Sequence, residues 1–171
     1  MKRGILLLSL LLSVAGCQKN SYPTFSKKYR VWYSCNILDA PFNQITTPGR
    51  FIAVSKSGSK IKTVDSDGNK TETELSAVQN NSYIMGLAGL IIGTPTFNND
   101  DVSVWAYDLG CPACDNMQAT LSFDSQGIAR CSKCKGSWNL NASGFPLNDD
   151  SERPLYRYPV MRSDHSITVS N

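Results

Sequence analysis

Short segments in which apolar and polar residues alternate fill the chain from residue 27 onward, and a two-residue period is typical of half-buried β-strands. Clusters of Gly, Pro, Asn and Asp separate these segments and predict tight turns, in one of which Gly68 is expected to supply a positive φ. Residues 76–92 are ambiguous, with a helical spacing at their start and a buried strand at their end. The predicted strands cover residues 29–37, 50–55, 60–64, 70–75, 90–92, 102–107, 119–123, 128–131, 138–140, 155–160 and 166–169.

This succession of short strands, without a long helix or an internal repeat, predicts an all-β fold, namely a small antiparallel barrel or sandwich. The length of 171 residues fits one domain with extensions. Apolar residues make up 41% of the chain and charged residues 18%, which permits a packed core and excludes disorder caused by composition. We therefore expect residues 27–171 to form one continuous β domain.

The first residues have the pattern of a targeting segment rather than of folded structure. Residues 1–3 are a short positive region, and residues 5–14 form an apolar run that is too short to span a bilayer. The run ends in the sequence Val-Ala-Gly-Cys at residues 14–17, which resembles the lipobox of bacterial lipoproteins. The resemblance implies cleavage before Cys17 and attachment of a diacylglyceryl group to its sulfur. An ordinary secretory signal, in which Cys17 is incidental, is the alternative.

On the lipoprotein interpretation, residues 1–16 are a signal peptide and residues 17–26 are a polar tether that begins with the lipidated cysteine. Several acyl chains together anchor a protein stably, so we expect an exported protein attached to a membrane of the bacterial cell envelope. The net charge is +3, and Lys2 and Arg3 supply two of these charges. The charge that remains is too small to indicate nucleic acid as a partner.

The strongest chemical signal is a pair of Cys-x-x-Cys motifs, formed by Cys111 with Cys114 and by Cys131 with Cys134. Two residues between cysteines let both sulfurs of a pair point into the same turn, and the connecting hairpin brings the second turn against the first. This spacing is typical of one tetrahedral metal centre with four thiolate ligands. Gly136 is expected to help the chain turn around the sulfurs, because glycine tolerates positive φ.

Further motifs surround the cysteines. The sequence Val-Trp-Ala-Tyr-Asp at residues 104–108 precedes the first pair, and Gly-Ser-Trp-Asn-Leu at residues 136–140 follows the second. Two closing segments lie at residues 143–147 and 153–160. In this order, over about residues 90–169, the motifs resemble those of a Rieske-type iron–sulfur domain. The resemblance implies a Rieske-like β fold whose two ligand turns are joined by a hairpin.

The ligands depart from this family. A Rieske centre needs two histidines on one iron and two cysteines on the other. Ala113 and Cys134 occupy the positions where the family has its histidines, and His165, the only histidine, is expected in an exposed polar turn. With a single histidine, the chain cannot supply the ligands of a true Rieske cluster. What remains is a Rieske-like scaffold that carries zinc-ribbon or rubredoxin-like cysteine turns.

Four thiolates admit three states. The site can hold structural Zn²⁺, it can hold iron as [2Fe–2S] or as a single rubredoxin-like ion, or it can contain two disulfides in place of a metal. Proteins loaded with cofactors in the cytoplasm usually leave by the twin-arginine route, and residues 2–4 are not a convincing twin-arginine motif. A chain exported unfolded can still take up zinc afterwards, so zinc is favoured.

Other candidate residues have simpler interpretations. Cys35 is expected to be a small buried hydrophobic residue, and Trp32, Trp105 and Trp138 are expected to pack in the core. The sequence has no Ser-His-Asp constellation, Gly-rich phosphate loop or nucleophile elbow, so we do not expect an enzyme. Two classes of function stay open: a lipid-anchored structural or interaction module held together by its metal, and an envelope electron-transfer protein with an unidentified redox partner.

Overall fold

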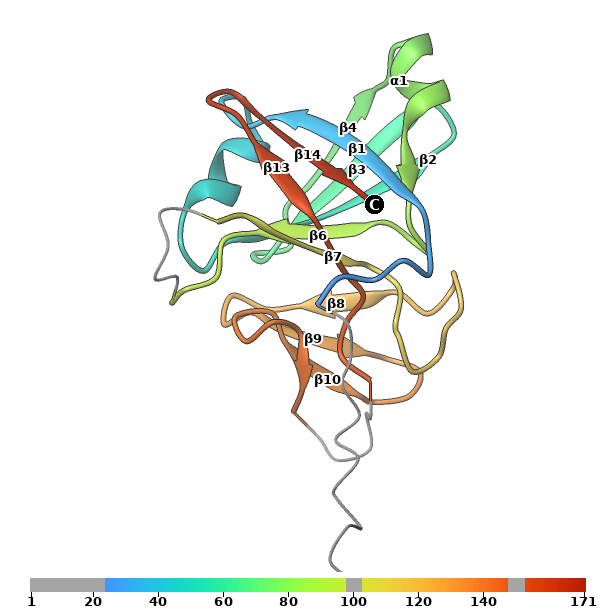
Figure 1. Cartoon of the computed structure of the whole chain (residues 1–171), viewed down its shortest axis with the longest axis vertical. Coiled ribbons are helices and arrows are strands. Elements are labelled where there is room, and N and C mark those ends of the chain that lie inside the picture. Colours follow the sequence, from blue (N-terminus) through green and yellow to red (C-terminus); the bar gives the residue numbers. More distant parts are fainter. Residues whose placement is uncertain (1–23, 98–102, 148–152) are drawn as a thin grey trace, which may run out of the picture.

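A computed structural model describes residues 24–97, 103–147 and 153–171 (Figure 1). Over these ranges the chain forms three antiparallel sheets that do not close into a barrel, so the predicted all-β fold is confirmed in its sandwich form. No helix within the same ranges is long and apolar enough to cross a membrane. The predicted signal peptide, Cys17 and the first part of the tether lie outside the described residues.

The largest sheet has the strand order β12-β7-β6-β2-β3-β4. Its strands are β2 (Phe51–Ser57), β3 (Lys60–Asp65), β4 (Lys70–Glu74), β6 (Leu90–Gly93), β7 (Trp105–Asp108) and β12 (Arg157–Tyr158). All four residues of β6 are buried, whereas every residue of the edge strand β4 is exposed. A continuous apolar strand at the centre of a sheet indicates that both faces of that sheet are covered.

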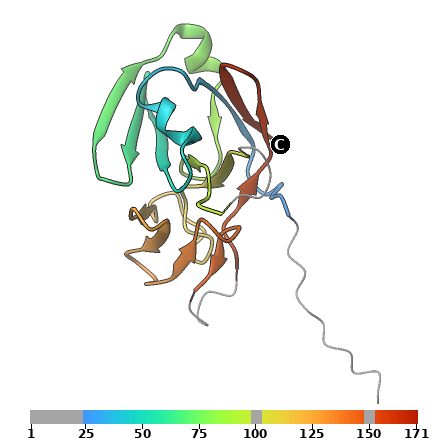
Figure 2. The same ribbon diagram turned by 90° about the vertical axis from the view of Figure 1, so that its left-hand side faces the viewer.

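Two smaller sheets cover these faces, which gives the molecule three layers (Figures 1 and 2). One has the order β13-β14-β1-β5 and consists of β1 (Val31–Asn36), β5 (Ile84–Met85), β13 (Val160–Arg162) and β14 (Ser166–Ser170). The other has the order β11-β10-β9-β8 and consists of β8 (Leu121–Phe123), β9 (Ile128–Cys131), β10 (Ser137–Asn139) and β11 (Phe145–Pro146). We call the latter the cysteine sheet, because Cys131 ends β9.

Alternate residues of the central strands divide between two cores. Ile92 on β6 packs with Val31 and Ile167 of the first small sheet. Its neighbour Ile91 points the other way and packs with Trp138 of the cysteine sheet. The two-residue period of a strand therefore attaches one layer to each face of the central sheet.

Several sequence-based expectations are confirmed and some are refined. Gly68 has a φ of 85° in the β3–β4 turn, as expected. The ambiguous segment begins with helix α1 (Ala77–Ser82), because Ser76 and Gln79 form a capping box at its start, and it ends in β6. The strand expected over residues 155–160 is divided into β12 and β13. A 3-10 helix, η1 (Phe42–Thr46), and the two-residue strands β5 and β11 were not expected.

The expectation that Trp32 packs in the core is wrong. Its neighbours on β1, Val31 and Tyr33, take the inward positions, so Trp32 points outward and is 47% exposed. Trp138 is fully buried, and Trp105 is partly buried against the core of the cysteine sheet. The aromatic content of β1 predicted a strand but did not indicate which face of that strand is buried.

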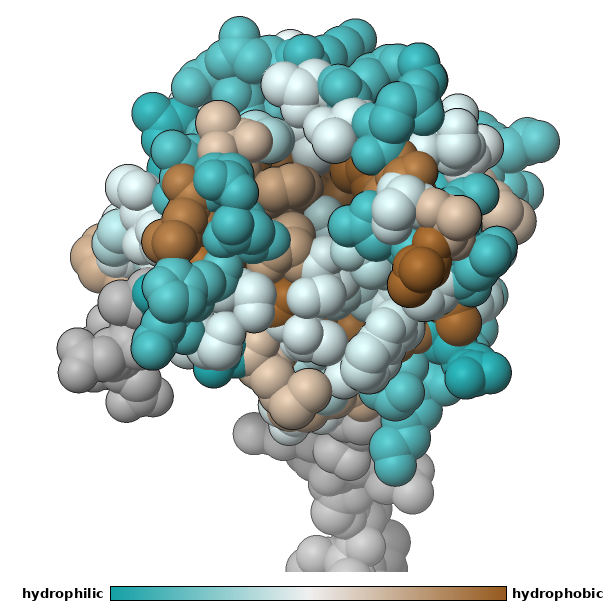
Figure 3. All heavy atoms as spheres, turned by 90° about the horizontal axis from the view of Figure 1, so that it is seen from above, coloured by the Kyte–Doolittle hydropathy of each residue, from teal (hydrophilic) through white to brown (hydrophobic). Residues whose placement is uncertain are grey.

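The end of the sandwich next to α1 is hollowed. Figure 3 shows apolar side chains at the base of this face, surrounded by hydrophilic residues. A cavity of about 280 Å³ lies here, and Tyr33, Cys35, Phe42 and Tyr83 are among the residues that line it. Cys35 is partly buried and packs against the inner core, in line with its expected role.

A buried carboxylate joins the central sheet to the chain just before the first cysteine pair. Asp108, at the end of β7, is 0% exposed and accepts hydrogen bonds from the backbone N–H groups of Leu87 (2.6 Å), Ala88 (3.2 Å) and Gly110 (2.7 Å). It also accepts one from the Tyr158 hydroxyl at 2.7 Å. Burial raises the pKa of Asp108, while these hydrogen bonds favour the carboxylate and oppose the rise.

We predict that Asp108→Ala destabilises the protein by about 3 kcal/mol, because it leaves the N–H groups of Leu87 and Gly110 buried without acceptors. Tyr158→Phe removes one donor and leaves the others paired, so it should cost only about 1 kcal/mol. Denaturant unfolding of both variants measures the difference. An equal decrease in the free energy of unfolding in the two variants would show that the carboxylate does not organise this turn.

Candidate metal centre

The first cysteine turn follows directly from the anchored end of β7. The backbone N–H of Cys111 donates to the carbonyl of Ala119 at 2.8 Å, which places the start of the turn against the strand leading into β8. The N–H of Asp115 then donates to the Cys111 carbonyl at 2.9 Å and closes the turn. Asp115 has a φ of 50°, a left-handed conformation that Asp tolerates better than most residues. The N–H of Cys114 points at the sulfur of Cys111, 3.5 Å away.

The second turn repeats this geometry between β9 and β10. The N–H of Lys135 donates to the Cys131 carbonyl at 3.0 Å, and Lys135 has a φ of 65°. Each turn therefore closes through the residue that follows its second cysteine. The expectation that Gly136 supplies the positive φ is wrong, since Lys135 adopts that conformation. Gly136 is needed for space, because a Cβ there would lie 2.7 Å from Cη2 of Trp138.

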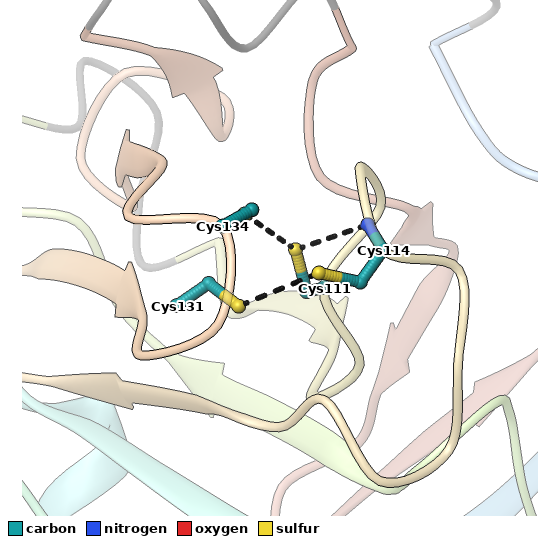
Figure 4. Close-up of side chains that lie close together, drawn as sticks. All are labelled: Cys111, Cys114, Cys131 and Cys134. Atoms are coloured by element: carbon teal, nitrogen blue, oxygen red, sulfur yellow. Dashed lines mark hydrogen bonds between the residues drawn. The ribbon is translucent and has the colours of Figure 1, made fainter.

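The two turns face each other, and all four predicted ligands converge (Figure 4). Their sulfurs all lie within 4.8 Å of one another. The Cys111 and Cys134 sulfurs are 3.5 Å apart, and the Cys114 and Cys131 sulfurs are 3.8 Å apart. A tetrahedral ion with metal–sulfur bonds of about 2.3 Å requires sulfur–sulfur distances of about 3.8 Å. The donor set and its spacing therefore fit one four-coordinate metal ion.

Exposure divides the four cysteines into two kinds. The first member of each pair is buried, with Cys111 0% and Cys131 2% exposed, whereas Cys114 is partly buried and Cys134 is exposed. The buried members lie on the side of Trp138 and the core of the cysteine sheet. The site is thus sealed on its inner side and open to solvent on its outer side.

Electrostatics set Cys131 apart from Cys111 and Cys114. Burial raises the pKa of Cys111 and Cys114 above the usual thiol range. Burial opposes ionisation of Cys131 as well, but hydrogen bonds from the backbone N–H groups of Cys134 and Lys133 outweigh it and lower the pKa of Cys131 to about 7. Cys131 therefore ionises more readily than Cys111 and Cys114, and a bound cation would favour the thiolate form of these two as well.

Two further candidates stay apart from the centre. His165 is exposed in the bend between β13 and β14, as expected. Cys35 lies on β1, and burial raises the pKa of its thiol to about 12, which makes it a poor nucleophile. Cys17 lies outside the described residues, so its predicted lipidation stays a prediction.

One group beside the site was not predicted from the sequence. The carboxylate of Asp115 forms an ion pair with the Lys28 ammonium and accepts hydrogen bonds from the hydroxyls of Tyr29 (2.8 Å) and Tyr156 (2.9 Å). The Lys28 ammonium lowers the pKa of Asp115 to about 2. These partners are far from Asp115 in the sequence, and only its position directly after Cys114 could have drawn attention to it.

We predict that Cys131→Ser abolishes stable metal binding and accelerates hydrogen exchange in residues 108–140, while the central sheet keeps its protection. Structural zinc in small modules contributes on the order of 10 kcal/mol, whereas the turns themselves bury little apolar surface. Metal analysis together with hydrogen exchange measures both effects. Cys35→Ser, which removes a thiol outside the centre, is the control and should retain the metal. Full metal content in Cys131→Ser would rule out the four-cysteine centre.

No known protein-family model matches this chain, and no curated protein matches it either.

Proposed function

We propose that this is a lipid-anchored protein of the bacterial cell envelope in which the four-cysteine centre holds a structural Zn²⁺ ion. The observation that carries the metal centre is the convergence of four sulfurs at the spacing of a single tetrahedral ion, whereas the anchor rests on the lipobox-like sequence at residues 14–17. Because the protein supplies all four ligands, no coordination position is left for a substrate. Such closed sites hold folds together, so we infer that the centre has a structural rather than a catalytic role.

The sulfur distances favour one ion over a two-iron cluster. A [2Fe–2S] core binds two cysteines on each iron, so the width of the core separates the two ligand pairs. Here all four sulfurs lie within 4.8 Å of one another, so no division into two pairs leaves room for the width of that core. A single rubredoxin-like iron fits these distances as well as zinc does. Zinc is preferred because a chain exported unfolded can acquire it after export.

A rubredoxin-like electron carrier is the second candidate, and the exposure of Cys134 supports it. A ligand sulfur at the surface would let a redox partner approach the iron closely. Metal analysis and the visible absorption of purified protein separate the two candidates. We expect a colourless protein with one zinc per chain. A red-brown protein that contains iron would overturn the structural role, and two disulfides found by mass spectrometry would overturn both candidates.

We propose that the scaffold is Rieske-like. The support is the arrangement of the ligand turns: one follows β7 of the central sheet, the other lies between β9 and β10, and β8 and β9 form the hairpin that connects them. The family's metal would sit between two such turns. In this chain the donor set is four sulfurs, so the resemblance extends to the scaffold and not to the cluster.

The lipid anchor is the remaining part of the proposal. We predict that Cys17→Ser moves the protein out of the membrane fraction, either as uncleaved precursor or in soluble form, because the sulfur is the acceptor of the lipid. Fractionation and intact-mass analysis of the mature chain measure this change. Ser21→Ala, in the same tether, is the control and should leave processing unchanged. Unchanged processing together with unchanged membrane partitioning in Cys17→Ser would overturn the lipobox interpretation.

A further inference from the structure

We propose that Asp115 is a positioning residue that fastens the N-terminal segment of residues 26–29 to the first cysteine turn, so that metal binding and docking of this segment stabilise each other. The inference rests on the proposed metal centre and concerns how that centre is held.

The contacts of Asp115 join three parts of the chain. One carboxylate oxygen accepts the hydroxyls of Tyr29 and Tyr156, at 2.8 and 2.9 Å, and the other receives the Lys28 ammonium. The same ammonium lies 3.2 Å from the Tyr156 hydroxyl and 5.4 Å from the ring centres of both tyrosines. The two rings pack edge to face at 5.6 Å. We call Lys28, Tyr29, Asp115 and Tyr156 the Asp115 clamp.

The clamp acts directly on the metal turn. The backbone N–H of Asp115 closes the turn through the Cys111 carbonyl, and Asp115 follows Cys114 in the sequence. Its left-handed backbone conformation is disfavoured for a residue with a Cβ, so the contacts of its side chain help to hold the turn in shape. A turn held in this shape keeps the sulfurs of both cysteines directed at the metal position.

The second turn provides an internal comparison. Lys135 has the same place in its turn, with the same backbone hydrogen bond and a similar φ. Within the part of the chain that the structure describes, its exposed side chain forms no hydrogen bond or ion pair. The side-chain clamp is therefore a property of the first turn and not a general requirement of this turn geometry.

The N-terminal segment has few other attachments. The Ser26 N–H donates to the Arg157 carbonyl at 2.7 Å, and the Asn171 side-chain amide donates to the carbonyls of Ser26 (3.0 Å) and Tyr29 (2.8 Å). Figure 2 shows this segment beside the last strands of the chain. The clamp fixes both the segment and the turn, so a metal that orders the turn must also favour the docked segment. By linkage, docking of the segment must favour metal binding by the same free energy.

The test compares zinc release from three variants loaded with one equivalent of zinc, using a coloured chelator as the acceptor. Asp115→Asn removes the ion pair, and the double variant Tyr29→Phe with Tyr156→Phe removes two donors without altering either turn. We expect zinc release to be about tenfold faster in both of these variants than in the wild type. This is the size of effect seen when residues that support a metal site from outside its ligands are replaced. Lys135→Gln is the matched control and should release zinc at the wild-type rate.

Two further measurements separate positioning from loss of a ligand or of the fold. The absorption spectrum of the cobalt-substituted Asp115→Asn protein should keep its four-thiolate character. In the wild type, removal of zinc should accelerate hydrogen exchange in residues 24–30. Two results would overturn the clamp alone. In one, both clamp variants bind one equivalent of zinc and release it at the wild-type rate. In the other, hydrogen exchange in residues 24–30 does not change when zinc is removed. A wild type that takes up no zinc would overturn the proposed metal centre and the clamp with it.

Discussion

The central strands of the six-stranded sheet are apolar on both faces, and the rest of the structure depends on covering both. Ile91 and Ile92 are each 0% exposed although they point in opposite directions. One face is covered by the sheet that contains β1 and β14, and the other by the cysteine sheet. The strands of the cysteine sheet contain only two to four residues, so this layer has little stability of its own. A metal that joined its β9–β10 turn to the turn after β7 would supply stability that these short strands lack.

The connection from the central sheet to the cysteine sheet shows how local polar contacts position a chemical site. The buried Asp108 fixes the chain before Cys111, while Asp115 fixes it after Cys114. The first carboxylate is sealed inside the fold and satisfied mainly by backbone N–H groups, whereas the second is exposed and satisfied by side chains. The first cysteine turn is therefore held at both ends by carboxylates with unlike surroundings, and the second turn relies on backbone geometry and on Trp138.

The strands and the four sulfurs could be predicted from the sequence because their signals are local. Alternation over a few residues indicates a strand, and two short cysteine spacings indicate a shared centre. The outward position of Trp32 could not be predicted, because it depends on which face of β1 meets the central sheet. The clamp could not be predicted either, since Lys28 and Tyr156 approach Asp115 only through the folded topology. Gly136 shows a third limit: its need for space comes from Trp138, and no property of the turn itself reveals it.

The unequal exposure of the four sulfurs has a consequence for how the centre can be taken apart. Cys111 and Cys131 are shielded by the protein, so an oxidant or a competing thiol must approach through Cys134 and then Cys114. In a metal-bound site, reaction of an outer sulfur would release the ion while the two inner sulfurs are still shielded. Chemical damage at this site would therefore advance from the surface inward, and its early stages would modify Cys134 and Cys114 before Cys111 and Cys131.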